Sequence, residues 1–315
     1  MKSTQSLRVL VAISASLILA ACGGGGGDEV KPTSSAGPII TTPTPTTPTT
    51  PTAPTPVTPA NPTTPATPST PNPVTPGLKV TGSASLVGSQ NLTVLFAGNA
   101  LKSTGLAGNF LSALTVPYSA QSVTPEGAFT VLAASSGAMT VKLSDVAEID
   151  DVTGNGQYAI GRWSAGHFDV TTSSTSNTQN INTNQGAPYM VGIPLDLYSG
   201  SGTGTLSCVY DKSTKPTSLD GSVAPGSFNG ATSTASINLS NKLISFSLSL
   251  DIGADHNVVV SKNSILVDMP MSAGGSTVIA ETVGSDVNKP YLVVAYGTTT
   301  PSSGDVGGIV VFRCQ

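Results

Sequence analysis

The sequence predicts an all-β fold: an antiparallel eight-stranded β-barrel preceded by a smaller β-rich region, after a disordered Pro/Thr tether. Charged residues make up only 10% of the chain and aromatic residues 5%, and glycine, serine and threonine are abundant, as in secreted β proteins. From residue 77 onward, short apolar runs alternate with turns rich in Gly, Asn, Asp and Ser. No stretch of that part repeats its apolar residues with a helical period.

Residues 1–21 have the order of a secretory signal peptide. Lys2 and Arg8 precede an apolar run, 9–21, that ends in small residues. The run is shorter than the roughly 20 residues that a membrane-spanning helix needs. A cysteine, Cys22, follows directly, and an ordinary signal peptide beside an unrelated cysteine remains the alternative.

The segment Leu19-Ala20-Ala21-Cys22 resembles the lipobox of bacterial lipoproteins. The resemblance implies cleavage before Cys22, a diacylglyceryl thioether on its sulfur and an acylated amino terminus. We expect this covalent lipid and no other cofactor. Gly23 stands where an Asp would, by resemblance to the enteric sorting rule, favour inner-membrane retention. The expected location is therefore the bacterial outer membrane, lipid-anchored and at the cell surface, since more than one acyl chain gives stable anchoring.

Residues 22–76 form a Gly and Thr/Pro-rich linker. Of the chain's 24 prolines, 15 lie between Pro32 and Pro76, and no charged residue occurs between Lys31 and Lys79. Repeated prolines hold the backbone near the polyproline conformation and prevent packing, at about 3.1 Å per residue or roughly 140 Å at full stretch. We expect an extended, semi-rigid tether that holds the folded part away from the membrane.

The folded part is predicted as a small β-rich region at 77–151 and an antiparallel β-barrel at 152–315, divided at the turn 151–156. The expected strands are 92–97, 110–116, 129–134 and 139–143, then 157–171, 189–194, 203–210, 227–239, 243–252, 258–269, 277–283, 292–296 and 308–314. In 243–252, apolar residues alternate with Ser and Asp, which indicates one buried and one exposed face. This strand and the alternating run before it predict a hairpin.

Cys208 and Cys314 are the remaining two cysteines, and a disulfide is the default for such a pair in an oxidising compartment. Each lies in phase with apolar residues of its own strand, so both sulfurs should point to the apolar side. Closing so long a loop would contribute about 4–5 kcal/mol in the chain-entropy model. Two buried free thiols are the alternative.

No residue pattern indicates catalysis or metal binding. His167 and His256 are the only histidines, too few for a zinc site without free cysteines. The chain contains no Gly-x-Ser-x-Gly elbow for a serine hydrolase. The turn 151–156 imitates half of a calcium loop, but Arg162 stands where the loop needs a bidentate Glu. We expect neither an enzyme nor a metal protein, and the net charge of −4 without a basic patch argues against nucleic acid.

Gly161-Arg162-Trp163 resembles the Gly-x-Trp of lipocalins, in which the tryptophan of the first strand packs near an arginine of the last. The resemblance implies that Trp163 and Arg313 pack together at one end of the barrel, as a cation–π contact of about 0.5–2 kcal/mol. Such a pair is part of the scaffold and does not indicate a ligand.

The chain as a whole resembles surface lipoproteins of the transferrin-binding type, whose eight-stranded barrel domains follow a strand-rich "handle". The resemblance covers about 157–315 and lies in Gly161-Arg162-Trp163-Ser164-Ala165-Gly166, Pro188-Tyr189-Met190-Val191-Gly192, Gly202-Thr203-Gly204-Thr205-Leu206 and Gly226-Ser227-Phe228-Asn229-Gly230. The chain has one lobe at most and lacks long charged insertions, which argues against transferrin itself as the partner.

These features favour a binding function: a monomer that captures an extracellular protein or nutrient with loops at the barrel mouth. The aromatic residues that we expect as ligand contacts are Tyr189, Tyr198, Tyr291 and Tyr296. The alternative is a structural or adhesive envelope lipoprotein with no small-molecule ligand. In either case the protein meets the membrane through its lipid anchor.

Overall fold

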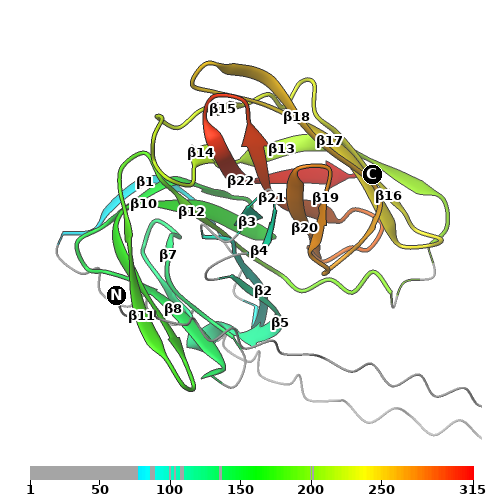
Figure 1. The fold of residues 1–315 in the computed structure, drawn as a ribbon. Coiled ribbons are helices and arrows are strands. Elements are labelled where there is room, and N and C mark those ends of the chain that lie inside the picture. The colour runs from blue at the N-terminus through cyan, green and yellow to red at the C-terminus, as the bar shows by residue number, and fades with distance from the viewer. Residues whose placement is uncertain are drawn as a thin grey trace, which may run out of the picture. The chain divides into compact units, whose positions relative to one another are not determined.

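The structure is a computed structural model and describes residues 77–85, 89–98, 101–102, 104–106, 110–134, 137–198, 200 and 202–315. The predicted signal peptide 1–21, Cys22 and the tether 22–76 lie outside the described residues. The described residues all fall in the compact unit Thr64–Gln315 and form two large β-sheets and one two-stranded pair (Figure 1). The predicted all-β fold class is confirmed.

Helix is nearly absent from the described part of the chain. One turn of 3₁₀ helix, η1 (Tyr118–Ala120), follows the strand β5 (Leu111–Pro117). Within the residues that the structure describes, no helix has the length and apolar character needed to cross a membrane.

The first sheet contains ten strands, coloured cyan to green in Figure 1. They are β1 (Lys79–Ser83), β2 (Asn91–Phe96), β5 (Leu111–Pro117), β6 (Ser122–Val123), β7 (Phe129–Ala133), β8 (Met139–Leu143), β9 (Glu148–Gly154), β10 (Tyr158–Thr172), β11 (Ser176–Ile181) and β12 (Ala187–Gly192). The main order is β5-β2-β12-β10-β8-β7-β6, and all pairs are antiparallel except β1 with β9. The separate pair is β3 (Leu101–Lys102) with β4 (Gly105–Leu106).

The second sheet also contains ten strands, coloured yellow-green to red in Figure 1. They are β13 (Thr205–Ser213), β14 (Thr217–Ser218), β15 (Ser227–Phe228), β16 (Thr234–Asn238), β17 (Leu243–Ile252), β18 (Asp255–Leu266), β19 (Met271–Ala273), β20 (Ser276–Val283), β21 (Tyr291–Thr300) and β22 (Gly304–Cys314). Eight of them follow one another as β18-β17-β16-β13-β22-β21-β20-β19, all antiparallel. The predicted hairpin is confirmed as β16 and β17, which pair from Thr234 opposite Ser247 to Asn238 opposite Leu243.

Three apolar cores stabilise this arrangement. One lies within the first sheet around Trp163, and one fills the inner face of the second sheet, where the alternating apolar residues of β17 are buried. A third joins the two sheets and includes Leu95 and Ile160 from the first and Val293 and Val311 from the second. The strands β20, β21 and β22 therefore bury both faces, which explains their nearly continuous apolar runs.

The structure corrects the division of strands that we predicted from the sequence. The expected boundary at Asp151 falls inside β9, and the strands predicted for the barrel at 157–171 and 189–194 are β10 and β12 of the first sheet. The physical reason is the length of β10, whose ladders pair it with β8, β9, β11 and β12. The single strand expected at 227–239 is divided into β15 and β16.

The two ends of the eight-strand order approach each other just after β18. The backbone N–H of Asp268 donates to the carbonyl of Ala280 on β20 at 2.8 Å. The side chain of Lys262 on β18 donates to the carbonyl of Ala273 on β19. Among the described residues no ladder pairs β18 with β19 or β20. The second sheet is thus shown as an antiparallel sheet whose ends meet at single contacts.

Candidate functional site

The predicted cysteine pair is present as a disulfide. Cys208 on β13 lies directly opposite Cys314 on β22 in the antiparallel register, and the sulfurs are 1.98 Å apart. Both residues are almost fully buried at the core of the second sheet. The bridge fastens the last strand of the chain to β13, whereas Cys22, the predicted lipidation residue, lies outside the described residues.

The structure does not bring Trp163 and Arg313 together. Trp163 is fully buried in the core of the first sheet, where its indole contacts Phe96 and its Nε1–H donates to the carbonyl of Phe129 at 2.8 Å. Arg313 is exposed on β22, opposite Val209. The predicted barrel-end pair is corrected because β10, which carries Trp163, belongs to the first sheet.

Only one of the four tyrosines expected as ligand contacts is well exposed. Tyr189 is buried in the first sheet and accepts the backbone N–H of Phe129, and Tyr296 is buried in the core of the second sheet. These two are corrected to core residues, and burial raises the pKa of both phenols. Tyr291 is half-buried against another tyrosine ring, and Tyr198 is 55% exposed.

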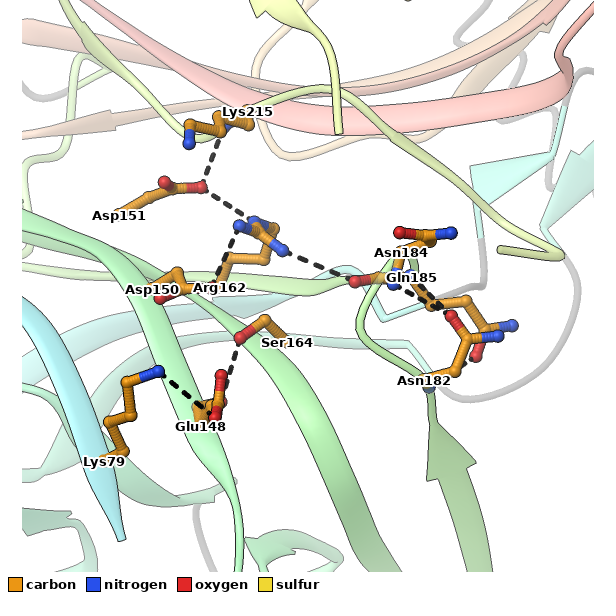
Figure 2. Close-up of polar contacts among 10 residues, drawn as sticks. All are labelled: Lys79, Glu148, Asp150, Asp151, Arg162, Ser164, Asn182, Asn184, Gln185 and Lys215. Atoms are coloured by element: carbon orange, nitrogen blue, oxygen red, sulfur yellow. Dashed lines mark hydrogen bonds and ion pairs between the residues drawn. The ribbon is translucent and has the colours of Figure 1, made fainter. Parts of the chain in front are cut away.

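A buried cation organises a polar cluster beside Trp163 (Figure 2). Arg162 is 2% exposed, and its Nε lies 2.7 Å from Asp151 Oδ2 while its Nη2 lies 3.4 Å from Asp150 Oδ2. Its Nη1 donates to the carbonyl of Gln185, and the backbone N–H of Lys215 donates to Asp151 Oδ2 at 2.9 Å. We call these five residues the Arg162 cluster.

The Arg162 cluster joins segments from the two sheets. The loop that contains Gln185 also donates side-chain hydrogen bonds to the carbonyls of Leu219 and Gly221, in the segment after β14. The charge of Arg162 is neutralised by carboxylates of the chain itself, and its Nε, Nη1 and Nη2 each donate to a partner. Such a cluster is a structural joint and leaves little capacity to bind a ligand.

A cavity of about 190 Å³ lies where the two sheets meet, and we call it the inter-sheet cavity. Its lining comes from the first sheet, from the segment after β12, from the two residues after β18 and from β20. The lining residues are Thr93, Thr115, Pro194, Leu195, Asp196, Leu197, Tyr198, Val267, Asp268 and Thr282. Tyr198 is thus the one predicted ligand contact that the structure places at a cavity.

The polar side chains of this cavity differ in whether they have a hydrogen-bond partner. Thr93 lies on β2, is fully buried, and its hydroxyl oxygen has no hydrogen-bond partner among the described residues. Thr282 donates to the carbonyl of Leu195 at 3.4 Å, and Asp196 accepts the backbone N–H of Tyr198 at 2.8 Å. Thr93 is therefore the lining group with unused hydrogen-bonding capacity.

Two lining residues have left-handed backbone conformations that side chains with a Cβ rarely adopt. Thr115 has φ 57° and Asp268 has φ 63°. Thr115 lies at a shift in the β2–β5 register, where β5 carries one extra residue. A bulge of this kind turns a side chain out of the sheet, and β-branched residues adopt such a φ only where their surroundings require it. Both residues line the cavity.

A buried carboxyl group on β20 directly precedes the lining residue Thr282. Glu281 on β20 is 0% exposed, and Ser112 on β5 donates to its Oε1 at 2.8 Å, across the boundary between the sheets. Burial, followed by the neighbouring Asp268, raises the pKa of Glu281 to about 9. Glu281 therefore keeps its proton at neutral pH.

Sequence reasoning missed Thr93, Asp268 and Glu281. The signal for Glu281 was available, because it is the lone charged residue in the apolar run 278–283, and a lone acid in a strand buried on both faces must be neutral or paired. Nothing in the sequence distinguishes Thr93 from other strand threonines.

Replacing Glu281 by glutamine is expected to flatten the pH dependence of stability between pH 6 and 8. The carboxyl keeps its proton up to a pKa of about 9 in the folded state and up to about 4.5 in the unfolded chain. Folding therefore takes up a proton in this range, and the free energy of unfolding falls as pH rises, by at most about 1.4 kcal/mol per pH unit. Glutamine can still accept from Ser112 but cannot titrate.

Urea unfolding at pH 6, 7 and 8 measures this effect. Glu148→Gln, a substitution at a carboxylate that is partly exposed beside Lys79, serves as the control and should keep the wild-type slope. If the wild type and Glu281→Gln give parallel curves, the proton is not held in the folded state.

No protein-family model matches this chain, and no curated protein matches it either. Within the described part of the chain, no group of three or more His, Cys, Asp or Glu side chains is placed to hold a metal ion.

Proposed function

We propose that the chain is a lipoprotein anchored through Cys22 in the bacterial outer membrane, with its folded part displayed at the cell surface as a binding module for an extracellular protein or nutrient. The signal-like segment 1–21, the lipobox-like Cys22 and the Pro/Thr tether support the location. The resemblance to transferrin-binding-type lipoproteins supports a binding role, and the protein is proposed to act as a monomer without catalytic activity.

One observation carries the binding role: the inter-sheet cavity is lined by a fully buried hydroxyl, Thr93, that has no partner among the described residues. An unpaired buried polar group costs about 1–3 kcal/mol, so native proteins seldom retain one without a purpose. A ligand that hydrogen-bonds to Thr93 recovers that cost. The exposed Tyr198 at the same cavity offers apolar and aromatic contact.

We further propose that the second sheet is the eight-stranded barrel, closed between β18 and β20. The hydrogen bond from Asp268 to Ala280 and the contact of Lys262 with Ala273 support closure at this point. The inner face of the sheet is filled by apolar side chains. A barrel with a filled interior leaves ligands to its outer surfaces, so we place binding at the inter-sheet cavity and not inside the barrel.

The second candidate is a structural or adhesive envelope lipoprotein with no small-molecule ligand. The filled inner face of the second sheet and the self-neutralised Arg162 cluster favour it, because neither needs a ligand. Under this alternative, the inter-sheet cavity holds water and Thr93 bonds to it.

The substitution Cys22→Ala is expected to abolish lipid attachment and release the protein from the membrane fraction, because the thioether needs the sulfur. Growth with labelled palmitate, followed by purification of the protein, measures the lipid. Gly24→Ala, which leaves the lipobox-like residues intact, should retain both label and membrane association. A labelled Cys22→Ala protein would contradict the anchor.

Surface display and capture are tested with the wild type. Protease added to intact cells should remove the protein, and resistance that disappears on lysis would exclude display at the surface. Purified full-length protein in detergent, immobilised and exposed to growth medium or host fluid, should retain one defined component. Display without any retained component would favour the structural alternative.

A further inference from the structure

We propose that the inter-sheet cavity binds a small organic ammonium compound, with Asp268 as its counter-ion and the Thr93 hydroxyl as its hydrogen-bond acceptor. The proposal rests on the binding function proposed above and names the class of ligand. It follows from the size of the cavity, its unpaired hydroxyl, its charge and its apolar wall.

The volume of the cavity limits the size of the ligand that it can hold. Its volume is about 190 Å³. A closed apolar cavity of roughly 150 Å³ accommodates benzene, so this one suits a molecule of roughly eight to ten non-hydrogen atoms.

Thr93 supplies the first polar contact. It is 0% exposed, it lines the cavity from β2, and its Oγ1 has no partner among the described residues. Its position in β2 has the same parity as Leu95, which places it on the face that meets the second sheet. A hydroxyl oxygen can accept a hydrogen bond, and an ammonium group carries only donors.

The acidic residues of the cavity wall favour a ligand with a positive charge. Asp196 and Asp268 are the ionisable acids among the ten lining residues, and none of the ten is Lys, Arg or His. Glu281 is fully buried and its pKa is raised, so it adds no charge, and the carboxyl groups of the cavity wall are those of Asp196 and Asp268. A cation is attracted to such a wall, whereas a carboxylate or phosphate is repelled.

The remaining wall suits a hydrocarbon group. Pro194, Leu195, Leu197 and Val267 supply aliphatic surface, and Tyr198 supplies an aromatic ring that is 55% exposed. An aromatic face adds attraction for a cation that lies over it. An alkyl or aryl group of the ligand can therefore pack against the wall while its ammonium group faces Asp268.

Isothermal titration calorimetry on the full-length protein in detergent tests the proposal with three probes of one shape: 2-phenylethylammonium, 2-phenylethanol and phenylacetate. The ammonium probe should bind about tenfold more tightly than the alcohol, and phenylacetate should not bind at about 10 mM. Equal affinity for the three probes, or no binding of the ammonium probe, would overturn the proposal.

Two substitutions locate the probe. Asp268→Asn should weaken ammonium binding about tenfold, and Thr93→Val about threefold to tenfold. Asparagine tolerates the left-handed backbone at residue 268, and valine keeps the shape of Thr93, so both variants should fold; their melting curves check this. Asp145→Asn, at an exposed carboxylate in the turn between β8 and β9, is the matched control and should bind as the wild type does. Unchanged affinity in Asp268→Asn would also overturn the proposal.

The outcome separates this inference from the proposed function. Suppose that the protein carries lipid on Cys22, is cleaved on intact cells and retains a component from the medium. If it then does not bind the ammonium probe, only the proposed ligand class is overturned. A protein that binds the probe through Asp268 but carries no lipid leaves this inference standing and overturns the anchor.

Discussion

Replacing Cys208 and Cys314 together by serine is expected to lower the free energy of unfolding by about 4–5 kcal/mol. The disulfide closes a loop with a sequence separation of 106, and the loss of this constraint increases the entropy of the unfolded chain. In a unit of this size, the melting temperature should fall by roughly 10–20 °C. Calorimetric melting of the two proteins under oxidising conditions measures the change.

Reduction provides a control for the serine variant. The wild type in reducing buffer should melt close to the double serine variant, whereas the variant itself should not respond to reductant. If the reduced and oxidised wild types melt at the same temperature, the bridge does not stabilise the fold. The last strand should stay in the sheet, since β22 pairs with β21 from Gly304 to Arg313 and with β13 beyond the bridge.

Replacing Arg162 by methionine is expected to cost about 3–5 kcal/mol of stability. Arg162 is 2% exposed, so its removal leaves Asp150 and Asp151 close together, partly buried and without the cation between them. It also removes the donor to Gln185 and loosens the joint between the two sheets. Urea unfolding at pH 7 measures the loss.

Lys79→Met provides the matched control in the same region, as Figure 2 shows. The Lys79–Glu148 pair is well exposed, with side chains 67% and 37% accessible, and pairs of this kind contribute about 0–1 kcal/mol. A second check adds Asp150→Asn and Asp151→Asn to Arg162→Met, which removes the uncompensated charge and should recover part of the stability. Equal losses for Lys79→Met and Arg162→Met would contradict a structural role for the Arg162 cluster.

Much of the fold could be predicted because strand alternation and turn residues are local signals. The limits of β8 and β17 agree with the sequence prediction, β2 lies one residue earlier than predicted, and β7 ends one residue earlier than predicted. Strands without an apolar pattern were missed: β11 reads Ser-Asn-Thr-Gln-Asn-Ile and is held by its ladder to β10. Such a strand is stabilised by the strand that it pairs with, and the local sequence does not show which strand that is.

The candidate site was less predictable for a related reason. The sequence does not indicate that Tyr189 and Tyr296 are buried, because a tyrosine can occupy a core or a surface position. The inter-sheet cavity unites residues near positions 93, 115, 195, 268 and 282, whose proximity depends on how one sheet packs on the other.

The sequence by itself determined the all-β class, the alternating hairpin and the pairing of Cys208 with Cys314, because composition, period and cysteine count act locally or by elimination. Only the tertiary structure decided that β10 and β12 belong to the first sheet, that Arg162 is neutralised within the fold, and that Glu281 is buried between the sheets. These depend on contacts between distant segments, and the free energy of such contacts is set by packing and burial, which a linear pattern does not contain.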